Sequence, residues 1–289
     1  MMTNIKSLVL VLFISFISEV YSQELKVATY NLRYNIEENH KFDSTRGEDW
    51  ARRGPAIAAL IRFHEFEIFG TQEGLLHQLE DLSGWLPGFA YVGAGRDDGK
   101  KGGEHTAVFY KNDRFRVLDH GDFWLSETPD QPSMGWDATC CNRLCTWIYF
   151  EELESKKRFY FFNTHFDHQG IIARKESSKL VLRKIREIAG VNPVIFMGDL
   201  NGGHDSDWYK ILSNSDMLLD TYQQLKFPYA NNGSFNGFGR RNSSNQIIDH
   251  IFTSDHFEII KWGILTDSYY GKFPSDHFPV MVELKLVEN

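Results

Sequence analysis

Chemically active side chains follow short apolar runs at several points of this sequence. Asn31, Glu73, His165 and Asp199 each come two to four residues after such a run. The runs are Leu25–Ala28, Glu67–Phe69, Phe159–Phe162 and Val194–Met197. Their shortness and their β-branched and aromatic residues predict buried strands. Because open α/β sheets bind ligands beyond the carboxyl ends of their strands, we expect these polar groups to share one rim.

Three carboxylates would repel one another if they met at that rim. Glu73, Asp199 and Asp276 would then hold like charges together, which raises the pKa of a carboxyl group. A hard divalent cation removes this conflict, and carboxylate and amide oxygens suit Mg²⁺ and Mn²⁺. These residues therefore indicate a phosphoesterase that depends on Mg²⁺ or Mn²⁺, with Asn31, Glu73 and Asp276 as the candidate ligands.

Six short motifs lie along the chain in the order of one known superfamily. They are Thr29-Tyr30-Asn31, Gln72-Glu73, Asn163-Thr164-His165, Gly198-Asp199-Leu200-Asn201, Ile248-Asp249-His250-Ile251 and Ser275-Asp276-His277. With them the chain resembles the endonuclease/exonuclease/phosphatase superfamily over residues 25–285, and residues 123–147 resemble its deadenylase and nocturnin side. The resemblance implies a deoxyribonuclease I-like α/β fold, a four-layer sandwich of two packed mixed β-sheets flanked by helices.

The motif residues match the needs of phosphoester hydrolysis, which are charge neutralisation, an activated water and a stabilised leaving oxygen. Asp199 is expected to activate or orient the water, and the Asn201 amide to hold the phosphate or the nucleophile. His277 is expected to bind a phosphate oxygen as an imidazolium, while Asp249 holds its other ring nitrogen. His165 is expected to donate to the transition-state oxygens or to assist the leaving group.

Each motif residue also has a purely structural explanation. Residues 199–203 could form an ordinary turn after a strand, because Asp, Asn and Gly favour turns. His165 and Asp249 could be ordinary residues at the ends of strands. Six motifs in the order of one superfamily favour the catalytic interpretation.

Several polar groups near the motifs keep two interpretations. Arg33 stands where many nucleases of the superfamily have an acid, which argues against a second permanent metal; it contacts phosphate or is a surface cation. Arg143 is either a bidentate phosphate clamp or the partner of a rim carboxylate. Asp167 and His168 belong to the site or to a surface loop. The loop 234–241 either stacks a base or sugar and holds a second phosphate, or packs as an ordinary loop.

The first 22 residues have the pattern of a secretory signal peptide. Lys6 precedes the apolar stretch Leu8–Ile17, which is too short to cross a bilayer, and Val20–Ser22 is a plausible cleavage site. We therefore expect a secreted or periplasmic protein without stable membrane insertion, in which residues 23–289 form one catalytic domain. We also expect a monomer.

The chain of 289 residues has a formal net charge of −8, and loss of residues 1–22 removes one Lys and one Glu and leaves this value unchanged. Such a chain lacks the broad positive field of non-specific nucleic-acid binders. The expected partner is therefore a phosphate-ester substrate, phosphodiester or phosphomonoester, a class that includes nucleotides and nucleic acids. The alternatives are a secreted endo- or exonuclease acting on DNA or RNA, and a non-catalytic binding module on the same fold.

The remaining periodicity predicts an alternation of helices and strands. The sequence predicts a loop at 35–49, helices at 50–64, 74–82, 171–189 and 206–212, and strands at 89–94, 105–110, 115–124, 143–150, 247–253 and 280–286. Cys140, Cys141 and Cys145 are the only cysteines. We expect small buried thiols, with at most one local disulfide; a bond to Cys145 requires the segment to turn.

Overall fold

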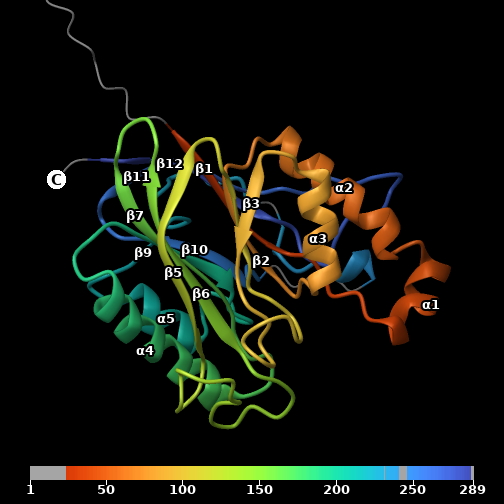
Figure 1. Ribbon diagram of the computed structural model, residues 1–289, viewed down its shortest axis with the longest axis horizontal. Coiled ribbons are helices and arrows are strands. Elements are labelled where there is room, and N and C mark those ends of the chain that lie inside the picture. The colour runs from red at the N-terminus through yellow and green to blue at the C-terminus, as the bar shows by residue number, and fades with distance from the viewer. Residues whose placement is uncertain (1–23, 231, 241–245, 288–289) are drawn as a thin grey trace, which may run out of the picture.

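Two six-stranded β-sheets pack face to face in this protein, and helices cover both outer faces (Figure 1). The computed structural model describes residues 24–230, 232–240 and 246–287. The expected signal peptide at 1–22 and Arg241 of the basic loop lie outside the described residues.

Each sheet contains one pair of parallel strands among antiparallel neighbours. In order across the first sheet, the strands are β11 (Phe257–Ile264), β12 (Val280–Leu286), β1 (Leu25–Asn31), β2 (Ile68–Gln72), β4 (Val108–Lys111) and β3 (Phe89–Val92). The second sheet has the order β5 (Phe115–Trp124), β6 (Leu144–Glu152), β7 (Arg158–His165), β8 (Val194–Asp199), β10 (Asp249–Thr253) and β9 (Leu219–Asp220). The parallel pairs are β1 with β2 and β7 with β8.

The helices fall into two groups, one for each sheet (Figure 1). They are α1 (Glu37–Arg46), α2 (Trp50–Phe63) and α3 (Leu76–Trp85), then α4 (Ile171–Ile188) and α5 (Asp207–Ser213), with a short 3₁₀ turn at Gly237–Gly239. Within the described ranges, no helix combines the length and apolar character needed to cross a membrane. The expected fold of two packed mixed sheets flanked by helices is confirmed.

The alternation of side chains along the strands builds three apolar layers. In β1, Val27 packs between the two sheets, whereas its neighbour Ala28 packs under α2 and α3. In β8, Ile195 faces the other sheet and Phe196 faces α4 and α5. Because successive side chains of a strand point to opposite faces, a strand covered on both faces is apolar throughout. This explains why these runs could be recognised in the sequence.

Strand register brings the site residues to one edge of the molecule. In the parallel pairs, Asn31 lies opposite Gln72, the residue before Glu73, and His165 lies opposite Asp199. In the antiparallel pair of β8 and β10, Asp199 lies opposite Asp249. The carboxyl ends of four strands and the start of β10 therefore meet at one rim.

Small residues allow close backbone approach beneath this rim. A Cβ at Gly70 would lie 2.4 Å from Asn163 Oδ1, so glycine makes room for the Asn163 amide between the sheets. Asn163 donates to the Thr71 carbonyl at 2.9 Å and accepts from Gln72 Nε2 at 2.7 Å. A Cβ at Gly198, whose φ is +147°, would lie 2.0 Å from the Thr164 carbonyl oxygen. The Asn163 hydrogen bonds connect the two sheets directly below the site, and the close approach at Gly198 joins β7 and β8 within one sheet.

Two parts of the secondary structure differ from the expectations. The predicted loop at 35–49 contains α1, which has no strong apolar stripe to reveal it and ends at Gly47 in the left-handed conformation. Strands β9 and β11 were not expected. β9 has only two residues, and β11 lies at the edge of its sheet, where the sequence alternates weakly.

Candidate active site

A cleft of about 750 Å³ opens where the strand ends of the two sheets meet. Seven of the predicted site residues line it, namely Glu73, Arg143, His165, Asp199, Asn201, Asp276 and His277. The other two, Asn31 and Asp249, are fully buried behind this lining. The structure therefore brings every predicted site residue to one place.

Asn31 connects the carboxylates contributed by the two sheets. Its Nδ2 atom donates to Glu73 Oε1 and to Asp199 Oδ2, both at 3.1 Å. Its amide oxygen, which we expected to bind metal, accepts the Arg33 backbone N–H at 2.9 Å. In this arrangement Asn31 orients the two carboxylates through its nitrogen.

Glu73 and Asp276 lie on either side of one positive charge. The Arg33 guanidinium is 3.8 Å from Glu73 Oε2 and 3.7 Å from Asp276 Oδ2. Glu73 Oε2 also accepts the Tyr34 N–H at 3.0 Å, and the Glu73 backbone has a φ of +63°. The Arg33 guanidinium therefore offsets part of the negative charge of both carboxylates. Arg33, which the sequence left open, is thus part of the site.

Burial and neighbouring charges act differently on these two acids. Burial alone would raise the pKa of Glu73, but Arg33, His277 and two hydrogen bonds outweigh it and hold the pKa below its usual value. For Asp276, burial dominates and raises the pKa, with a further contribution from the charge of Glu73. A cation at this position would relieve the second effect and stabilise both ionised groups.

Asp249, His277 and Asp199 form a chain of alternating charge. His277 Nδ1 lies 2.9 Å from Asp249 Oδ2, and its Nε2 lies 3.7 Å from Asp199 Oδ2. Burial would lower the pKa of His277, but Asp249 and then Asp199 raise it to about 10. Burial and the nearby charge of Asp249 raise the pKa of Asp199 to about 7. The arrangement therefore holds an imidazolium beside a carboxylate that can exchange a proton near neutral pH.

His165 is neutral in this environment. Its Nε2 lies 3.6 Å from Asp199 Oδ2, and its Nδ1 lies 3.9 Å from Glu104 Oε2. Burial, followed by the positive charges of Arg143 and Arg96, lowers the pKa of His165 well below its ordinary value. A neutral imidazole still donates one N–H, so the expected hydrogen bond to a phosphate or leaving oxygen remains available.

Asn201 holds the carboxylate beside it. Its backbone N–H donates to Asp199 Oδ1 at 2.9 Å, and its Nδ2 donates to the Phe166 carbonyl at 3.0 Å. The residue has a φ of +49°, a conformation that Asn tolerates better than most residues. Residues 199–201 therefore form the turn that was the structural interpretation, and the same turn places Asp199 and Asn201 in the candidate active site.

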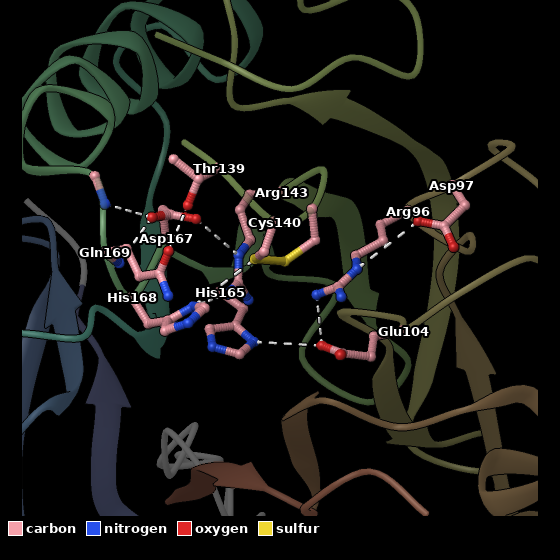
Figure 2. Close-up of a disulfide and its surroundings, with 12 residues drawn as sticks. Arg96, Asp97, Glu104, Thr139, Cys140, Arg143, His165, Asp167, His168 and Gln169 are labelled. Atoms are coloured by element: carbon pink, nitrogen blue, oxygen red, sulfur yellow. Dashed lines mark hydrogen bonds and ion pairs between the residues drawn. A yellow bond between two sulfur atoms is a disulfide. The ribbon is translucent and has the colours of Figure 1, made fainter. Parts of the chain in front are cut away.

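Arg143 makes the ion pair that was one of its two interpretations, and it also lines the cleft (Figure 2). Its Nε lies 3.7 Å from Asp167 Oδ2, and its Nη2 donates to His168 Nδ1 at 3.0 Å. Asp167 is buried, and its Oδ1 accepts the backbone N–H groups of Gln169 and Gly170. His168 is exposed and lines the cleft. Asp167 and His168 are thus parts of the rim of the site.

The structure contains one local disulfide, as the sequence allowed, but Cys140 is exposed and Cys141 only partly buried, so the expectation of buried thiols is wrong for these two residues. The bond joins the adjacent residues Cys140 and Cys141, and both line the cleft. Cys145 is a free buried thiol, as expected for a small apolar residue in β6. A strand keeps Cys145 pointing into the core, so it cannot turn toward the loop that precedes it.

Three charged residues of the site carried no recognisable signal in the sequence. Arg96 and Glu104 line the cleft and form an ion pair at 2.6 Å. Arg53 is fully buried in α2 and donates to four main-chain carbonyls, those of Leu32, Arg33, Glu48 and Pro274. Arg53 thereby holds the chain after Asn31 against the segment that carries Asp276.

The loop 234–241, which contains Arg240 and Arg241, reaches the cleft through its aromatic residues. Phe235 packs edge-on against the His277 ring with 5.0 Å between the ring centres, and Phe238 also lines the cleft. The backbone N–H groups of Asn236 and Gly237 donate to the Asp276 carbonyl. Arg240 is paired with Glu48. The described part of this loop therefore supports the two residues at positions 276 and 277.

Known proteins are similar to this chain in fold and in sequence. The sequence model of the endonuclease/exonuclease/phosphatase family matches residues 28–277. The chain belongs to this family of phosphoester hydrolases, whose members generally use divalent metals. The expected resemblance is confirmed. The chain spans 37% of the length of one curated relative, an uncharacterised protein of Acanthamoeba polyphaga mimivirus that is 23% identical over 256 residues, or 78% of this chain.

Several solved structures superpose on nearly the whole chain. A family member from Bacteroides thetaiotaomicron is 46% identical, with a TM-score of 0.86 over 91% of this chain and 97% of that chain. A mannosyl-6-phosphatase from Bacteroides thetaiotaomicron VPI-5482 is 45% identical, with a TM-score of 0.85 over 90% of this chain and 99% of that chain. The human nocturnin catalytic domain is 18% identical, with a TM-score of 0.70 over 91% of this chain and 94% of that chain, a likeness of fold.

Proposed function

We propose that this protein is an exported, divalent-metal-dependent phosphatase that acts on small phosphate monoesters. The observation that carries the proposal is the chain Asp249–His277–Asp199, in which His277 and Asp199 line the same cleft as Glu73. It combines a protonated donor with an acceptor whose pKa is about 7. Hydrolysis of a phosphate ester needs both groups at one place.

Glu73 and Asp276 are the residues that would hold Mg²⁺ or Mn²⁺. When bound, the ion supplies neutralisation of charge on the phosphate oxygens. Both side chains offer carboxylate oxygens to the cleft, and Arg33 contacts both within 3.8 Å. Asn31 keeps Glu73 in place through its Nδ2 hydrogen bond. The charge of Arg33 adds to the attraction of this region for a phosphate.

The remaining site residues divide the proton chemistry among them. Asp199 is the acceptor for a proton of the attacking water, and Asn201 and Asn31 hold its two oxygens in place. His277 stays protonated through Asp249 and donates from Nε2 to a phosphate oxygen. His165 donates a neutral N–H on the side of the leaving oxygen.

A sugar phosphate is the substrate class that we favour. The 45% identity to a mannosyl-6-phosphatase, together with its 99% coverage, supports a hexose 6-phosphate as the first substrate to examine. The formal charge of −8 also favours a small substrate over a polyanion. A secreted nuclease is the alternative. It would show turnover that falls steeply with salt, because a polymer contacts many phosphates and releases many counterions.

A substrate panel tests the proposal. Mannose 6-phosphate, p-nitrophenyl phosphate, bis(p-nitrophenyl) phosphate, single-stranded DNA and duplex DNA are each offered with Mg²⁺ or Mn²⁺, with and without EDTA. We expect hydrolysis of the two monoesters, with a weak salt dependence, and its loss in EDTA. Undiminished turnover in chelator would refute metal dependence, and cleavage of DNA alone would establish the nuclease alternative.

Export is a separate part of the proposal. It rests on the sequence pattern of residues 1–22. Expression of the full chain in a bacterial host, followed by cell fractionation and N-terminal sequencing, tests it. We expect the processed protein to begin at Gln23 in the periplasm or medium. An unprocessed chain confined to the cytoplasm would contradict export.

A further inference from the structure

One wall of the cleft is unlike the acidic region around Glu73. It consists of Cys140, Cys141, Arg143 and His168, and we call it the disulfide wall (Figure 2). Cys140 is exposed, and its sulfur lies 4.0 Å from His168 Nδ1. Because His165 lies next to this wall in Figure 2 and also faces Asp199, the wall begins where the phosphate site ends.

Arg143 determines which hydrogen bond His168 can offer to a ligand. Its Nη2 donates to His168 Nδ1 at 3.0 Å, so Nδ1 acts as the acceptor. Burial and the charge of Arg143 lower the pKa of His168, which keeps the ring neutral. The proton of a neutral imidazole with an accepting Nδ1 is on Nε2. His168 is exposed, so this N–H is available in the cleft.

The charges around the disulfide wall are balanced. Arg143 faces Asp167 at 3.7 Å, and the neighbouring Arg96 is paired with Glu104 at 2.6 Å. A second phosphate would need an excess of positive charge, which these pairs do not leave. A neutral group that forms hydrogen bonds meets no such requirement. The two sulfurs add a polarisable, apolar surface that suits the C–H face of a ring.

The Phe and Tyr side chains that line the cleft come from other segments. They are Tyr34, Phe42, Phe235 and Phe238. Nucleic-acid bases are commonly held by stacking on such rings. The disulfide wall itself contains no Phe, Tyr or Trp, and its one ring is the imidazole of His168. Its chemistry therefore matches hydroxyl groups better than a base.

We propose that the disulfide wall is the subsite for a neutral, hydroxyl-rich leaving group, a sugar ring esterified by the scissile phosphate. Cys140–Cys141 packs against the ring, His168 donates to a hydroxyl oxygen, and Arg143 is a positioning residue that acts through His168. The proposal rests on the proposed phosphatase function and deepens it by assigning the group beyond the phosphate.

The test compares two monoesters that differ in the group beyond the phosphate, mannose 6-phosphate and p-nitrophenyl phosphate. In His168→Ala, we expect the ratio of kcat/KM for the sugar ester to that for the aryl ester to fall about tenfold, through KM of the sugar ester, as for loss of one hydrogen bond. His168→Gln, whose amide can accept from Arg143 and donate to the sugar, should recover most of the ratio. His120→Ala, at an exposed histidine of β5 outside the cleft lining, should leave it unchanged.

The disulfide is tested by chemistry as well as by substitution, since Cys140→Ser/Cys141→Ser can affect folding. Mild reduction of the folded wild-type protein should lower the same ratio, since it opens the Cys140–Cys141 bond and leaves Cys145, already a free thiol, unchanged. An unchanged ratio after reduction and in His168→Ala would overturn the inference. The inference would also be overturned if the wild-type protein preferred a hexose bisphosphate to mannose 6-phosphate and the same variants lost this preference. The disulfide wall would then bind an anion.

Calorimetry with mannose 6-phosphate separates this inference from the proposed function. Wild-type protein that hydrolyses no phosphoester, yet binds this ligand through His168, would refute the phosphatase function and support the subsite. Hydrolysis of both monoesters, with kcat and KM unchanged in the His168 variants, would support the function and refute the subsite. Neither hydrolysis nor binding would refute both.

Discussion

Replacing Asp249 by Asn tests the chain of charges at the centre of the site. Asp249 Oδ2 lies 2.9 Å from His277 Nδ1, and Asp249 is the strongest of the groups that raise the pKa of His277 to about 10. It also contributes, after burial, to the rise in the pKa of Asp199 to about 7. Asn keeps the size of the side chain and one acceptor oxygen, while it removes the charge and replaces the second oxygen by an NH2 group.

The expected direction follows from the sign of each effect. Without the charge of Asp249, His277 loses its stabilising anion and gives up its proton at lower pH. Asp199 loses a repelling anion, so it too gives up its proton at lower pH. Both limbs of the pH profile of kcat/KM should therefore move toward acid. For a single close charge, we expect the descending limb to move by about 1–3 units.

The change in rate can be worked out at one pH. With a pKa of about 10, His277 is almost fully protonated at pH 9. A fall of about two units would leave roughly one tenth of it protonated, so kcat/KM at this pH should fall about tenfold further than at pH 7. A bound cation affects the wild type and Asp249→Asn alike, so the prediction concerns the difference between their pH profiles of kcat/KM.

Folding stability gives an independent reading of the same pair. The pKa of His277 is raised from 6.5 to about 10 by folding, so its contribution to stability is full below about pH 6.5 and is lost as the pH rises through 10. Asp249→Asn should therefore reduce the free energy of unfolding more at pH 6 than at pH 10. Asp255→Asn, at an exposed position, is the matched control. If the pH dependences of kcat/KM and of the free energy of unfolding in Asp249→Asn both coincide with those of the wild type, Asp249 does not set the charge of His277.

Three further substitutions separate metal binding, catalysis and packing. Glu73→Gln should weaken Mn²⁺ binding in calorimetry without unfolding the protein, because it removes the charge of a candidate ligand that lines the cleft; unchanged affinity would exclude Glu73 as a ligand. Asp199→Asn should lower kcat by about two to three orders of magnitude, as expected for a group that acts in the transition state; near-normal turnover would mean that the water is activated elsewhere. Gly198→Ala should lower the melting temperature by several degrees or more, because its Cβ would lie 2.0 Å from the Thr164 carbonyl oxygen. Gly190→Ala is the control, since no atom lies within 4 Å of its Cβ and it tests the cost of a positive φ alone. Equal falls in melting temperature for the two variants would refute the steric argument.

The parts of the site that could be predicted from the sequence are those fixed by strand ends. Asn31, His165 and Asp199 are the last residues of β1, β7 and β8, and Asp249 is the first residue of β10. An apolar run reveals the strand, and the register of a buried sheet then fixes where the strand ends lie. The four-layer fold followed from the same runs and from the family resemblance.

The parts that could not be predicted depend on contacts far apart in the chain. Arg53 looks like any helix arginine, yet its guanidinium bonds carbonyls 21 and 221 residues away. Arg96 and Glu104 belong to an irregular segment with no periodicity, and their position becomes clear only once that segment folds beside His165. The pairing of Cys140 with Cys141 depends on the conformation of a loop, which the sequence pattern does not determine.

The division of labour between strands and loops has a consequence for specificity. The groups of the proposed chemistry are fixed by strand register and by the bridge from Gln72 to Asn163 at 2.7 Å, so their mutual geometry cannot change without moving the sheets. The disulfide wall comes from irregular segments beside that frame, where substitutions disturb no strand pairing. A different leaving group can therefore be accommodated by changes around Cys140 and His168 while Asp199 and His277 stay as they are. This predicts that the two properties can be altered separately, which the ratio of the two monoesters measures directly.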